Sequence, residues 1–480
     1  MRITPFLYAA KYWALLAMLT LVTGPAQAQY ASVDTYIIGA TVSNVAVGDL
    51  NGDGNLDIVT TSRGIQVLFG QANGKFDAPR TYDATLGGRI ALGDVNGDGR
   101  LDIVTCQYGS MAGGMVSILL GQGGDNFSST TSYLIGALNH PVWIALGDVN
   151  GDGHLDIVTA NYENDTVSVL AGQAGGGFAT ASYYVGVSGG KPYCVALGDM
   201  NGDGLLDIVT TNELANTVSV LLASGGSGFA PAKIYPTGAA SNPYGNAQQL
   251  ALGDVNKDGR LDIVINNSYN VSVLIGEANG NLAPFIPYSI GNHSNTSYAV
   301  QLGDMNGDGY LDIVTSSDTN VDILLGQAGG GFAAVQNFSR GNFLSDDCET
   351  LALGDLNGDG QLDIVTANGM GNTISVLLST KAVLATTQPG SALVEAQAVL
   401  FPNPVAGSTN LAFTLGKAAH VELIITDALG RTIDTIKAGL LPAGQQNIRW
   451  NRQRQAAGIY FFSLRFDGQP AGTRRGVLAE

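Results

Sequence analysis

The sequence predicts an all-β chain, in which a seven-bladed β-propeller of four-stranded blades, closed by an N-terminal strand, precedes a small C-terminal β-sandwich. Three observations predict this fold. The twelve-residue phrase G-D-x-N-x-D-G-x-L-D-I-V occurs seven times. Short β-branched runs bounded by turn residues follow each copy, which indicates strands rather than helices. A different pattern of strand-like runs begins near residue 393.

The seven copies are separated by 45 to 55 residues. Repetition at a fixed period of this size indicates an array of similar supersecondary units. In the first repeat, four strand-like runs cover residues 45–47, 56–60, 65–69 and 76–82, and they are termed strands A to D. Four-stranded units arranged around a centre form a propeller.

The predicted N-terminal closure depends on one spacing. Strand D begins with a large residue, and an aromatic residue follows six positions later, as in Phe76 and Tyr82. The seventh repeat breaks off after strand C, at residues 374–378, and lacks this pair. The same spacing occurs at the other end of the chain, in Tyr30 and Tyr36. We therefore expect the N-terminal strand to complete the last blade, which leaves no sheet edge open to aggregation.

The repeated phrase predicts a cation-binding loop. Asp or Asn occupies positions 1, 3, 5 and 9, and the Gly at position 6 allows a sharp turn. Ca²⁺ binds several oxygen ligands in a flexible shell. Position 7 shares no side-chain chemistry among the copies, so its ligand would be a backbone carbonyl. The predicted side-chain ligands of up to seven Ca²⁺ ions are Asp49, Asn51, Asp53, Asp57, Asp94, Asn96, Asp98, Asp102, Asp148, Asn150, Asp152, Asp156, Asp199, Asn201, Asp203, Asp207, Asp254, Asn256, Asp258, Asp262, Asp304, Asn306, Asp308, Asp312, Asp355, Asn357, Asp359 and Asp363.

Two alternatives explain the phrase less well. Asx-turns need only one Asp or Asn, whereas each loop has three carboxylates and an amide. An EF-hand would have Glu at position 12, where the first copy has Thr60, and helices rather than strands would flank it.

Charge and composition exclude several classes of protein. The net charge is −18, and the seven loops hold 21 of the 40 acidic residues. No basic stripe suited to nucleic acid appears. The four His residues have no nucleophile or zinc ligand at a catalytic spacing, so no catalytic constellation is visible and we do not expect an enzyme. Cys106, Cys194 and Cys348 are odd in number, so free thiols are expected, with one disulfide as the alternative.

Residues 1–28 have the features of a secretory signal peptide. Arg2 and Lys11 precede an apolar stretch of about ten residues, which is too short to span a bilayer. Ala26-Gln27-Ala28 forms a small-x-small cleavage site. No later segment is apolar enough to span a membrane. Export would expose the loops to millimolar extracellular calcium, which suits weak sites.

The loops, together with turns such as residues 69–79, resemble the FG-GAP (VCBS-type) repeats of integrin-α-like β-propellers. The resemblance covers about residues 30–380 and recurs seven times. It implies seven blades with calcium in the A–B hairpins. Asn at position 3 departs from the Asp that is frequent in the family, and Lys257 in the fifth loop replaces a Gly, which is expected to weaken that site.

The lengths of the connections predict which face binds a ligand. The A–B and C–D connections keep their lengths, whereas the B–C and D–A connections vary, and variable loops on a rigid scaffold commonly carry binding. We therefore expect an extracellular glycan or protein ligand on the B–C/D–A loop face. That face would display Arg63, Tyr108, His140, Trp143, Tyr162, Glu163, Lys191, Tyr193, Tyr244, Tyr269, His293, Tyr298, Arg340 and Phe343.

The predicted propeller covers residues 29–380, a linker follows at 381–392, and residues 393–480 form the predicted sandwich. This last segment resembles the C-terminal sorting domain of the type nine (Por) secretion system. The matching stretches are Phe401-Pro402-Asn403-Pro404, Asp427–Arg431, Gly458-Ile459-Tyr460 and Arg474–Leu478. The resemblance implies transport across the outer membrane by the secretion machinery, followed by release or attachment to the cell surface.

The sequence thus favours a secreted or surface-attached, monomeric calcium-binding propeller that serves as a binding or adhesion module. The rival hypothesis is a calcium-dependent polysaccharide-degrading enzyme, a lyase or hydrolase, which would recruit Lys191, Tyr193, Arg340 and His293. A passive surface scaffold is the third alternative.

Overall fold

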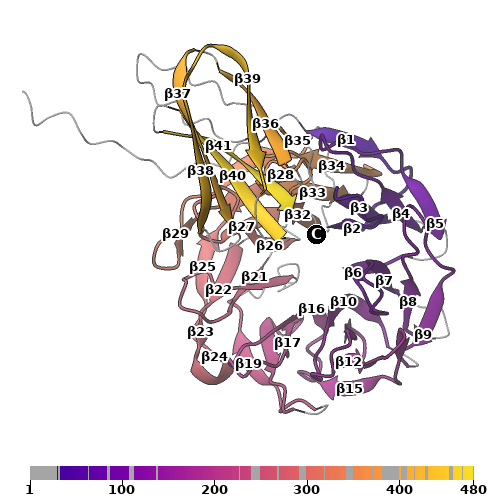
Figure 1. Cartoon of the computed structure of the whole chain (residues 1–480). Helices are drawn as coiled ribbons and strands as arrows, with labels where there is room; N and C mark the ends of the chain where they lie inside the picture. The colour runs from indigo at the N-terminus through magenta and orange to yellow at the C-terminus, as the bar shows by residue number, and fades with distance from the viewer. Residues whose placement is uncertain are drawn as a thin grey trace, which may run out of the picture. The chain divides into compact units, whose positions relative to one another are not determined.

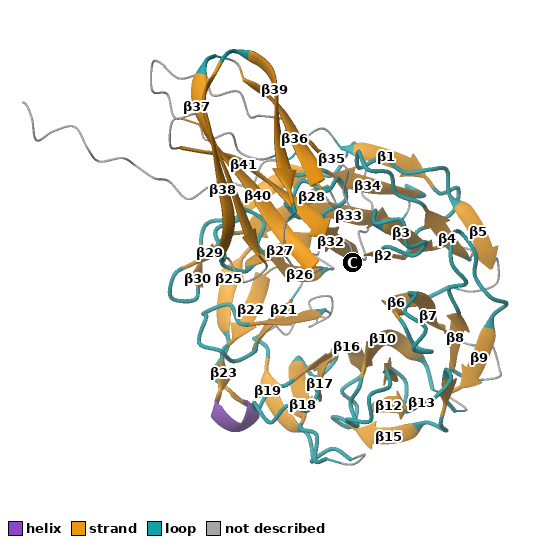
Figure 2. Cartoon of the chain, in the orientation of Figure 1, coloured by secondary structure: helices purple, strands orange, loops and turns teal. Residues whose placement is uncertain are grey.

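The computed structural model describes residues 30, 33–62, 64–83, 87–107, 113–136, 139–225, 228–238, 249–267, 270–290, 299–317, 319–341, 350–369, 371–380, 399–401, 408–415, 417–427, 431–452, 458–466 and 469–478. Two compact units divide between residues 382 and 383. Strands dominate both units (Figure 2). The predicted signal peptide lies outside the described residues, as does the predicted linker.

The first unit contains seven four-stranded antiparallel sheets among its described residues. The first blade consists of β2 (Asn44–Gly48), β3 (Asp57–Thr61), β4 (Ile65–Leu68) and β5 (Arg80–Asp83), and the second of β6 (Arg89–Gly93), β7 (Asp102–Gln107), β8 (Met115–Leu119) and β9 (Thr131–Leu134). The third consists of β10 (Pro141–Gly147), β11 (Asp156–Asn161), β12 (Thr166–Leu170) and β15 (Ser182–Val185). The fourth consists of β16 (Pro192–Gly198), β17 (Asp207–Asn212), β18 (Thr217–Leu221) and β19 (Lys233–Pro236).

The last three blades are β20 (Leu250–Gly253), β21 (Asp262–Asn266), β22 (Asn270–Leu274) and β25 (Ile286–Ser289); β26 (Val300–Gly303), β27 (Asp312–Ser316), β28 (Asn320–Leu324) and β31 (Gln336–Ser339); β32 (Leu351–Gly354), β33 (Asp363–Asn368), β34 (Thr373–Leu377) and β1 (Asp34–Ile37). Short ribbons join the third and fourth strands of three blades: β13 (Gly172–Gln173) with β14 (Gly177–Phe178), β23 (Gly276–Glu277) with β24 (Asn281–Leu282) around the 3₁₀ turn η1 (Ala278–Gly280), and β29 (Gly326–Gln327) with β30 (Gly331–Phe332).

The prediction that strand D of the first blade begins at Phe76 is wrong. Phe76 instead forms an isolated bridge with Gly70 across the turn, and the outer strand β5 begins only at Arg80. Pro79, which has no backbone N–H, immediately precedes β5 and cannot donate to the sheet ladder.

The ring closes as predicted. Strand β1 pairs antiparallel with β34, from Asp34 opposite Val376 to Ile37 opposite Thr373 (Figure 1). The innermost strands also contact one another in order, β2, β6, β10, β16, β20, β26 and β32, and β32 contacts β2. The first and last blades are therefore neighbours in space.

Tight packing at the end of each innermost strand joins the blades. A Cβ atom on Gly48 would lie 2.8 Å from Leu101 Cδ1 of the next blade, and one on Gly354 would lie 2.8 Å from Leu56 Cδ1 across the closure. Glycine permits this close approach because it has no side chain. The second strands are covered on both faces, so they are continuously buried, and Ile58 and Val59 are both 0 % exposed.

The second unit contains two antiparallel sheets among its described residues. One sheet has the order β35 (Val399–Phe401), β36 (Ser408–Leu415) and β39 (Gly444–Asn451). The other has the order β38 (Thr432–Leu441), β37 (Ala419–Asp427), β40 (Gly458–Phe466) and β41 (Gln469–Leu478). Both sheets contribute to one apolar core, in which Trp450 packs edge-on against Phe462. The predicted small sandwich is confirmed.

Candidate metal loops and ligand face

The A–B loop of the first blade folds around its own acidic side chains. The carboxylate of Asp49 accepts the backbone N–H groups of Gly52 (2.8 Å), Asp53 (3.1 Å) and Gly54 (2.8 Å). Asn51 Oδ1 accepts the N–H of Asp53 at 2.9 Å, and Asp53 Oδ1 accepts the N–H of Asn55 at 2.8 Å. Gly52 and Gly54 have positive φ values of 79° and 88°, which favour glycine.

All seven loops share this arrangement. In each, the first Asp accepts the N–H groups of positions 5 and 6. The fifth loop differs at position 4, where Lys257 adopts a left-handed φ of 61°. Its ammonium lies 3.8 Å from the centroid of the Tyr310 ring in the next loop. The loop shape therefore survives the substitution, although a non-glycine residue is strained in this conformation.

The Asp at position 9 has a second use that the sequence did not reveal. Asp57 is fully buried, and its carboxylate accepts the N–H of Leu50 at 2.9 Å and the N–H of Gly70 at 2.8 Å. The side chain thus joins the A–B loop to the backbone two residues beyond the third strand, which ends at Leu68.

The same two bonds recur in every blade, with lengths of 2.6–2.9 Å. The other carboxylates are Asp102, Asp156, Asp207, Asp262, Asp312 and Asp363.

Burial raises the pKa of these carboxyl groups. The pKa of Asp57, Asp102 and Asp363 is raised to about 6, and that of Asp312 to about 7. In each case desolvation is the largest cause, the two backbone N–H groups oppose it, and neighbouring loop carboxylates add to it. A nearby cation would favour the charged form.

The chemistry of the loop suits a hard divalent cation because its donors are all oxygens. A carboxylate oxygen that accepts one N–H keeps a lone pair for a metal. Within the described residues, however, no three His, Cys, Asp or Glu side chains are grouped as a metal site would require. In two loops a position-7 arginine pairs with the position-5 carboxylate, Arg100 with Asp98 and Arg260 with Asp258. The calcium ligands therefore stay a prediction.

Part of the predicted ligand face gathers on the third and fourth blades. Lys191 Nζ lies 3.1 Å from Glu163 Oε2 and 5.6 Å from the centroid of the Tyr162 ring. The ring of His140 lies 6.5 Å from that of Tyr162, and burial lowers the pKa of His140 against the opposing effect of Glu163. Seven predicted members of this face lie outside the described residues: Arg63, Tyr108, Tyr244, Tyr269, His293, Tyr298 and Phe343.

Arg340 does not belong to the exposed face. Its side chain is 0 % exposed, and its guanidinium donates to the Ser317 carbonyl at 3.1 Å and to Asn368 Oδ1 at 2.6 Å. Its placement on the ligand face is therefore wrong, because a buried guanidinium satisfies its donors within the fold. The group proposed for the rival enzyme is not brought together in the described residues, since Arg340 is buried in this way and Lys191 pairs with Glu163.

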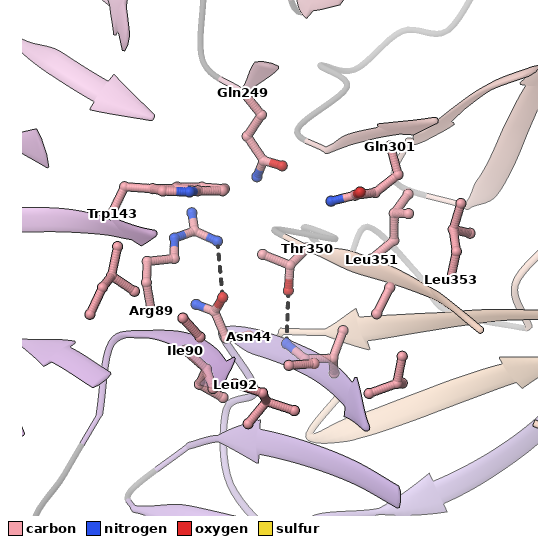
Figure 3. A pocket seen from close by; sticks show the side chains of 16 residues that line it. Asn44, Arg89, Ile90, Leu92, Trp143, Gln249, Gln301, Thr350, Leu351 and Leu353 are labelled. Atoms are coloured by element: carbon pink, nitrogen blue, oxygen red, sulfur yellow. Dashed lines mark hydrogen bonds between the residues drawn. The ribbon is translucent and has the colours of Figure 1, made fainter. Parts of the chain in front are cut away.

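Trp143 and Tyr193 lie near the centre of the ring. Trp143 lines a cavity of about 390 Å³ bounded by innermost strands, together with Asn44, Arg89, Gln249 and Thr350 (Figure 3). The hydroxyl of Tyr193 accepts a hydrogen bond from Arg89 Nη2 at 3.3 Å. These residues lie where the D–A connections enter the innermost strands, so the cavity is termed the channel mouth.

The innermost strands carry a sequence signal for the channel mouth that the loop lengths do not show. The residue five positions before the first loop Asp differs from one repeat to another. The residue three positions before it is Ala in six repeats and Gln301 in the remaining one. Side chains two apart share one face of a strand. A varied position within an otherwise repeated strand therefore indicates most of the lining. At this position Asn44, Arg89, Trp143, Gln249 and Thr350 line the channel mouth, whereas Cys194 and Ala299 are buried and do not.

Among the described residues, the structure has no helix that combines the length and the apolar character needed to cross a bilayer.

Two protein families match parts of the chain in sequence. The FG-GAP-like repeat family matches residues 49–105, 94–159, 148–210, 199–265, 254–315 and 304–366. The secretion system C-terminal sorting domain matches residues 399–477, and it indicates export to the cell surface or the medium. No curated protein matches the chain in sequence.

Solved structures resemble the chain at low sequence identity. A structure of BBS1N in complex with ARL6DN is 12 % identical to this chain in sequence. The match covers 75 % of this chain and 98 % of that chain, with a TM-score of 0.51. Virginiamycin B lyase from Staphylococcus aureus is 13 % identical over 73 % of this chain and 99 % of its own, with a TM-score of 0.48. An Agrocybe aegerita lectin that recognises non-reducing terminal N-acetylglucosamine is 21 % identical over 63 % and 81 %, with a TM-score of 0.47.

Since the repeat matches together span residues 49–366, more than half of the chain, the protein belongs to the FG-GAP-like repeat family and carries a secretion system C-terminal sorting domain.

Proposed function

We propose that this exported propeller binds calcium in its A–B loops and uses the opposite, B–C/D–A loop face as a binding or adhesion surface for a glycan or protein ligand. The proposed ligand face is supported by a contrast between repeated and varied residues within the innermost strands. Their apolar frame is repeated in every blade, whereas the residues at the channel mouth differ from blade to blade. A rigid repeated scaffold with varied residues at one end is typical of a binding surface.

The calcium part is supported by the repeated loops. Each has two carboxylates and an amide oxygen held inward by its own backbone, and a Gly turn at position 6. Seven such loops place like charges close together within each turn, and a divalent cation would remove that repulsion. The cation is thus proposed to be structural, and to be coupled to the stability of the ring.

A glycan array probed with the full chain, in calcium and in chelator, tests both parts. We expect calcium-dependent capture of a defined glycan without any change in its length. Release of shortened oligosaccharides would contradict the binding function and favour the degrading enzyme. Equilibrium dialysis with Ca²⁺ measures the metal separately, and no uptake would refute the calcium part alone.

A further inference from the structure

Arg89 is a buried cation without an acidic partner among the described residues. Its side chain is 8 % exposed, yet its hydrogen-bond partners are neutral: Asn44 Oδ1 at 3.4 Å from Nη1 and the Tyr193 hydroxyl at 3.3 Å from Nη2. The guanidinium carbon also lies 4.3 Å from the centroid of the Trp143 ring. Buried charges are normally paired with an opposite charge. Both hydrogen bonds are long for their type, so these contacts leave guanidinium capacity unused.

The guanidinium borders the channel mouth rather than solid core. In Figure 3 it lies beneath the Trp143 ring, and the side-chain amides of Gln249 and Gln301 point into the same space. A charge that faces a cavity can take its missing partner from a ligand. Arginine presents paired N–H donors in a plane, which match the two oxygens of a carboxylate.

The rest of the lining limits what that ligand can be. The other polar side chains at the channel mouth are neutral amides and a hydroxyl, in Asn44, Gln249, Gln301 and Thr350. Amides and hydroxyls both donate and accept, so they complement ligand hydroxyl groups. One cation among several neutral groups fits a single negative charge on a body rich in hydroxyls, and it does not fit a multiply charged phosphate. A volume of about 390 Å³ lies in the range of small-molecule sites.

We propose that the channel mouth binds a carboxylate-bearing sugar unit of an acidic glycan, with the carboxylate on Arg89 and the sugar hydroxyls on the surrounding amides. This inference deepens the proposed function and rests on it, since it names the ligand class for the B–C/D–A loop face. The Trp143 ring holds the guanidinium in place, so it acts as a positioning residue for Arg89.

Isothermal titration of the full chain in calcium tests the inference with two probes of the same length: an oligogalacturonate and its carboxyl-reduced, neutral counterpart. We expect the acidic probe to bind at least tenfold more tightly. Arg89→Gln should weaken the acidic probe by about ten- to a hundredfold, as expected for losing a charged hydrogen bond, and should leave the neutral probe nearly unchanged. Gln301→Ala, an exposed position at the same mouth, should weaken both probes by a smaller factor.

Arg80→Gln is the matched control, because it removes one positive charge from an exposed strand outside the cavity. It should leave the preference for the acidic probe intact. The comparison of the two probes on the unaltered chain needs no variant, so equal affinities would overturn the inference even if Arg89→Gln fails to fold by circular dichroism.

Equal affinity for both probes would overturn the inference, as would an acid preference that survives Arg89→Gln. So would a polyglutamate peptide that competes as well as the oligogalacturonate, since it would assign the site to an acidic peptide. If neutral glycans bind on the array without any acid preference, only the inference fails. If the array and a screen of candidate protein ligands both show no binding, the ligand part of the proposed function fails with it.

Discussion

Tyr36 and Phe76 pack edge to face, with ring centroids 5.6 Å apart and planes at 89°. Tyr36 lies on β1, which completes the last blade, whereas Phe76 belongs to the first. Beside them, Lys75 Nζ lies 2.5 Å from Asp34 Oδ2. Equivalent edge-on pairs join other neighbouring blades, including Tyr82 with Phe127 and Tyr30 with Phe338. The closure is therefore one more copy of the regular contact between blades.

Removal of this ring should weaken the closure. Tyr36→Ala is expected to lower the free energy of unfolding by about 1–3 kcal/mol, because it deletes a half-buried aromatic contact. Urea denaturation followed by fluorescence measures the loss. The adjacent Ile37 is 75 % exposed, so Ile37→Ala should change stability by less than about 0.5 kcal/mol. Equal effects of the two substitutions would show that β1 contributes nothing through the Tyr36 ring.

The buried loop carboxylates should stabilise each blade even without metal. Asp57→Ala leaves the N–H groups of Leu50 and Gly70 without their acceptor, at an expected cost of about 2–4 kcal/mol. The control is Asp77→Ala in the same blade, where the side chain is 45 % exposed and the expected cost is below about 1 kcal/mol. Both are compared by chemical denaturation in chelator. A mild effect of Asp57→Ala under these conditions would limit its role to metal binding.

Chelation should destabilise the propeller. At about 2 mM calcium and dissociation constants of roughly 10⁻⁴–10⁻³ M, each filled site would contribute about 0.6–1.8 kcal/mol. Scanning calorimetry should therefore show a lower Tm in chelator, restored by added Ca²⁺. Asp53→Asn is expected to remove one equivalent of bound calcium in equilibrium dialysis, whereas Asp77→Asn should remove none. A Tm that does not change with calcium concentration over the millimolar range would contradict a structural role for the bound calcium.

The glycines that end the innermost strands should not accept a side chain. A Cβ on Gly198 would lie 2.6 Å from Leu261 Cδ1 and 2.9 Å from Leu252 Cδ1. Gly198→Ala is therefore expected to cost about 1–3 kcal/mol by overpacking the contact between blades. A Cβ on Gly331 would meet nothing within 4 Å, and its φ is not positive, so Gly331→Ala serves as the control. Thermal unfolding should separate the two variants by several degrees.

Two cysteines should be unreactive in the folded chain. Cys106 and Cys194 are buried and free, and burial raises the pKa of each thiol to about 12. At pH 8 both thiols stay protonated, and only the thiolate reacts quickly. Mass spectrometry after iodoacetamide treatment should show both unmodified in native buffer and both alkylated in urea. Rapid alkylation of either thiol in native buffer would contradict its burial.

The sequence predicted the local features of the fold well. The period of the loops indicated the blades, the six-residue spacing of Tyr30 and Tyr36 indicated the closing strand, and the change of pattern after residue 380 indicated the sandwich. The predicted strand D of the first blade was longer than the observed one. The strand pattern alone assigns Phe76 to the sheet, whereas in the structure Phe76 forms an isolated bridge with Gly70.

By itself the sequence determined the repeated unit, its number and the acidic loops, because short-range spacing and turn chemistry specify each hairpin. Only the tertiary structure decided what each side chain meets. It placed Asp57 against two backbone N–H groups, buried Arg340 among structural partners, and brought Arg89 under Trp143 from the neighbouring blade. These contacts join residues from separate strands and blades, so they depend on how the sheets pack around the centre, which local spacing does not encode.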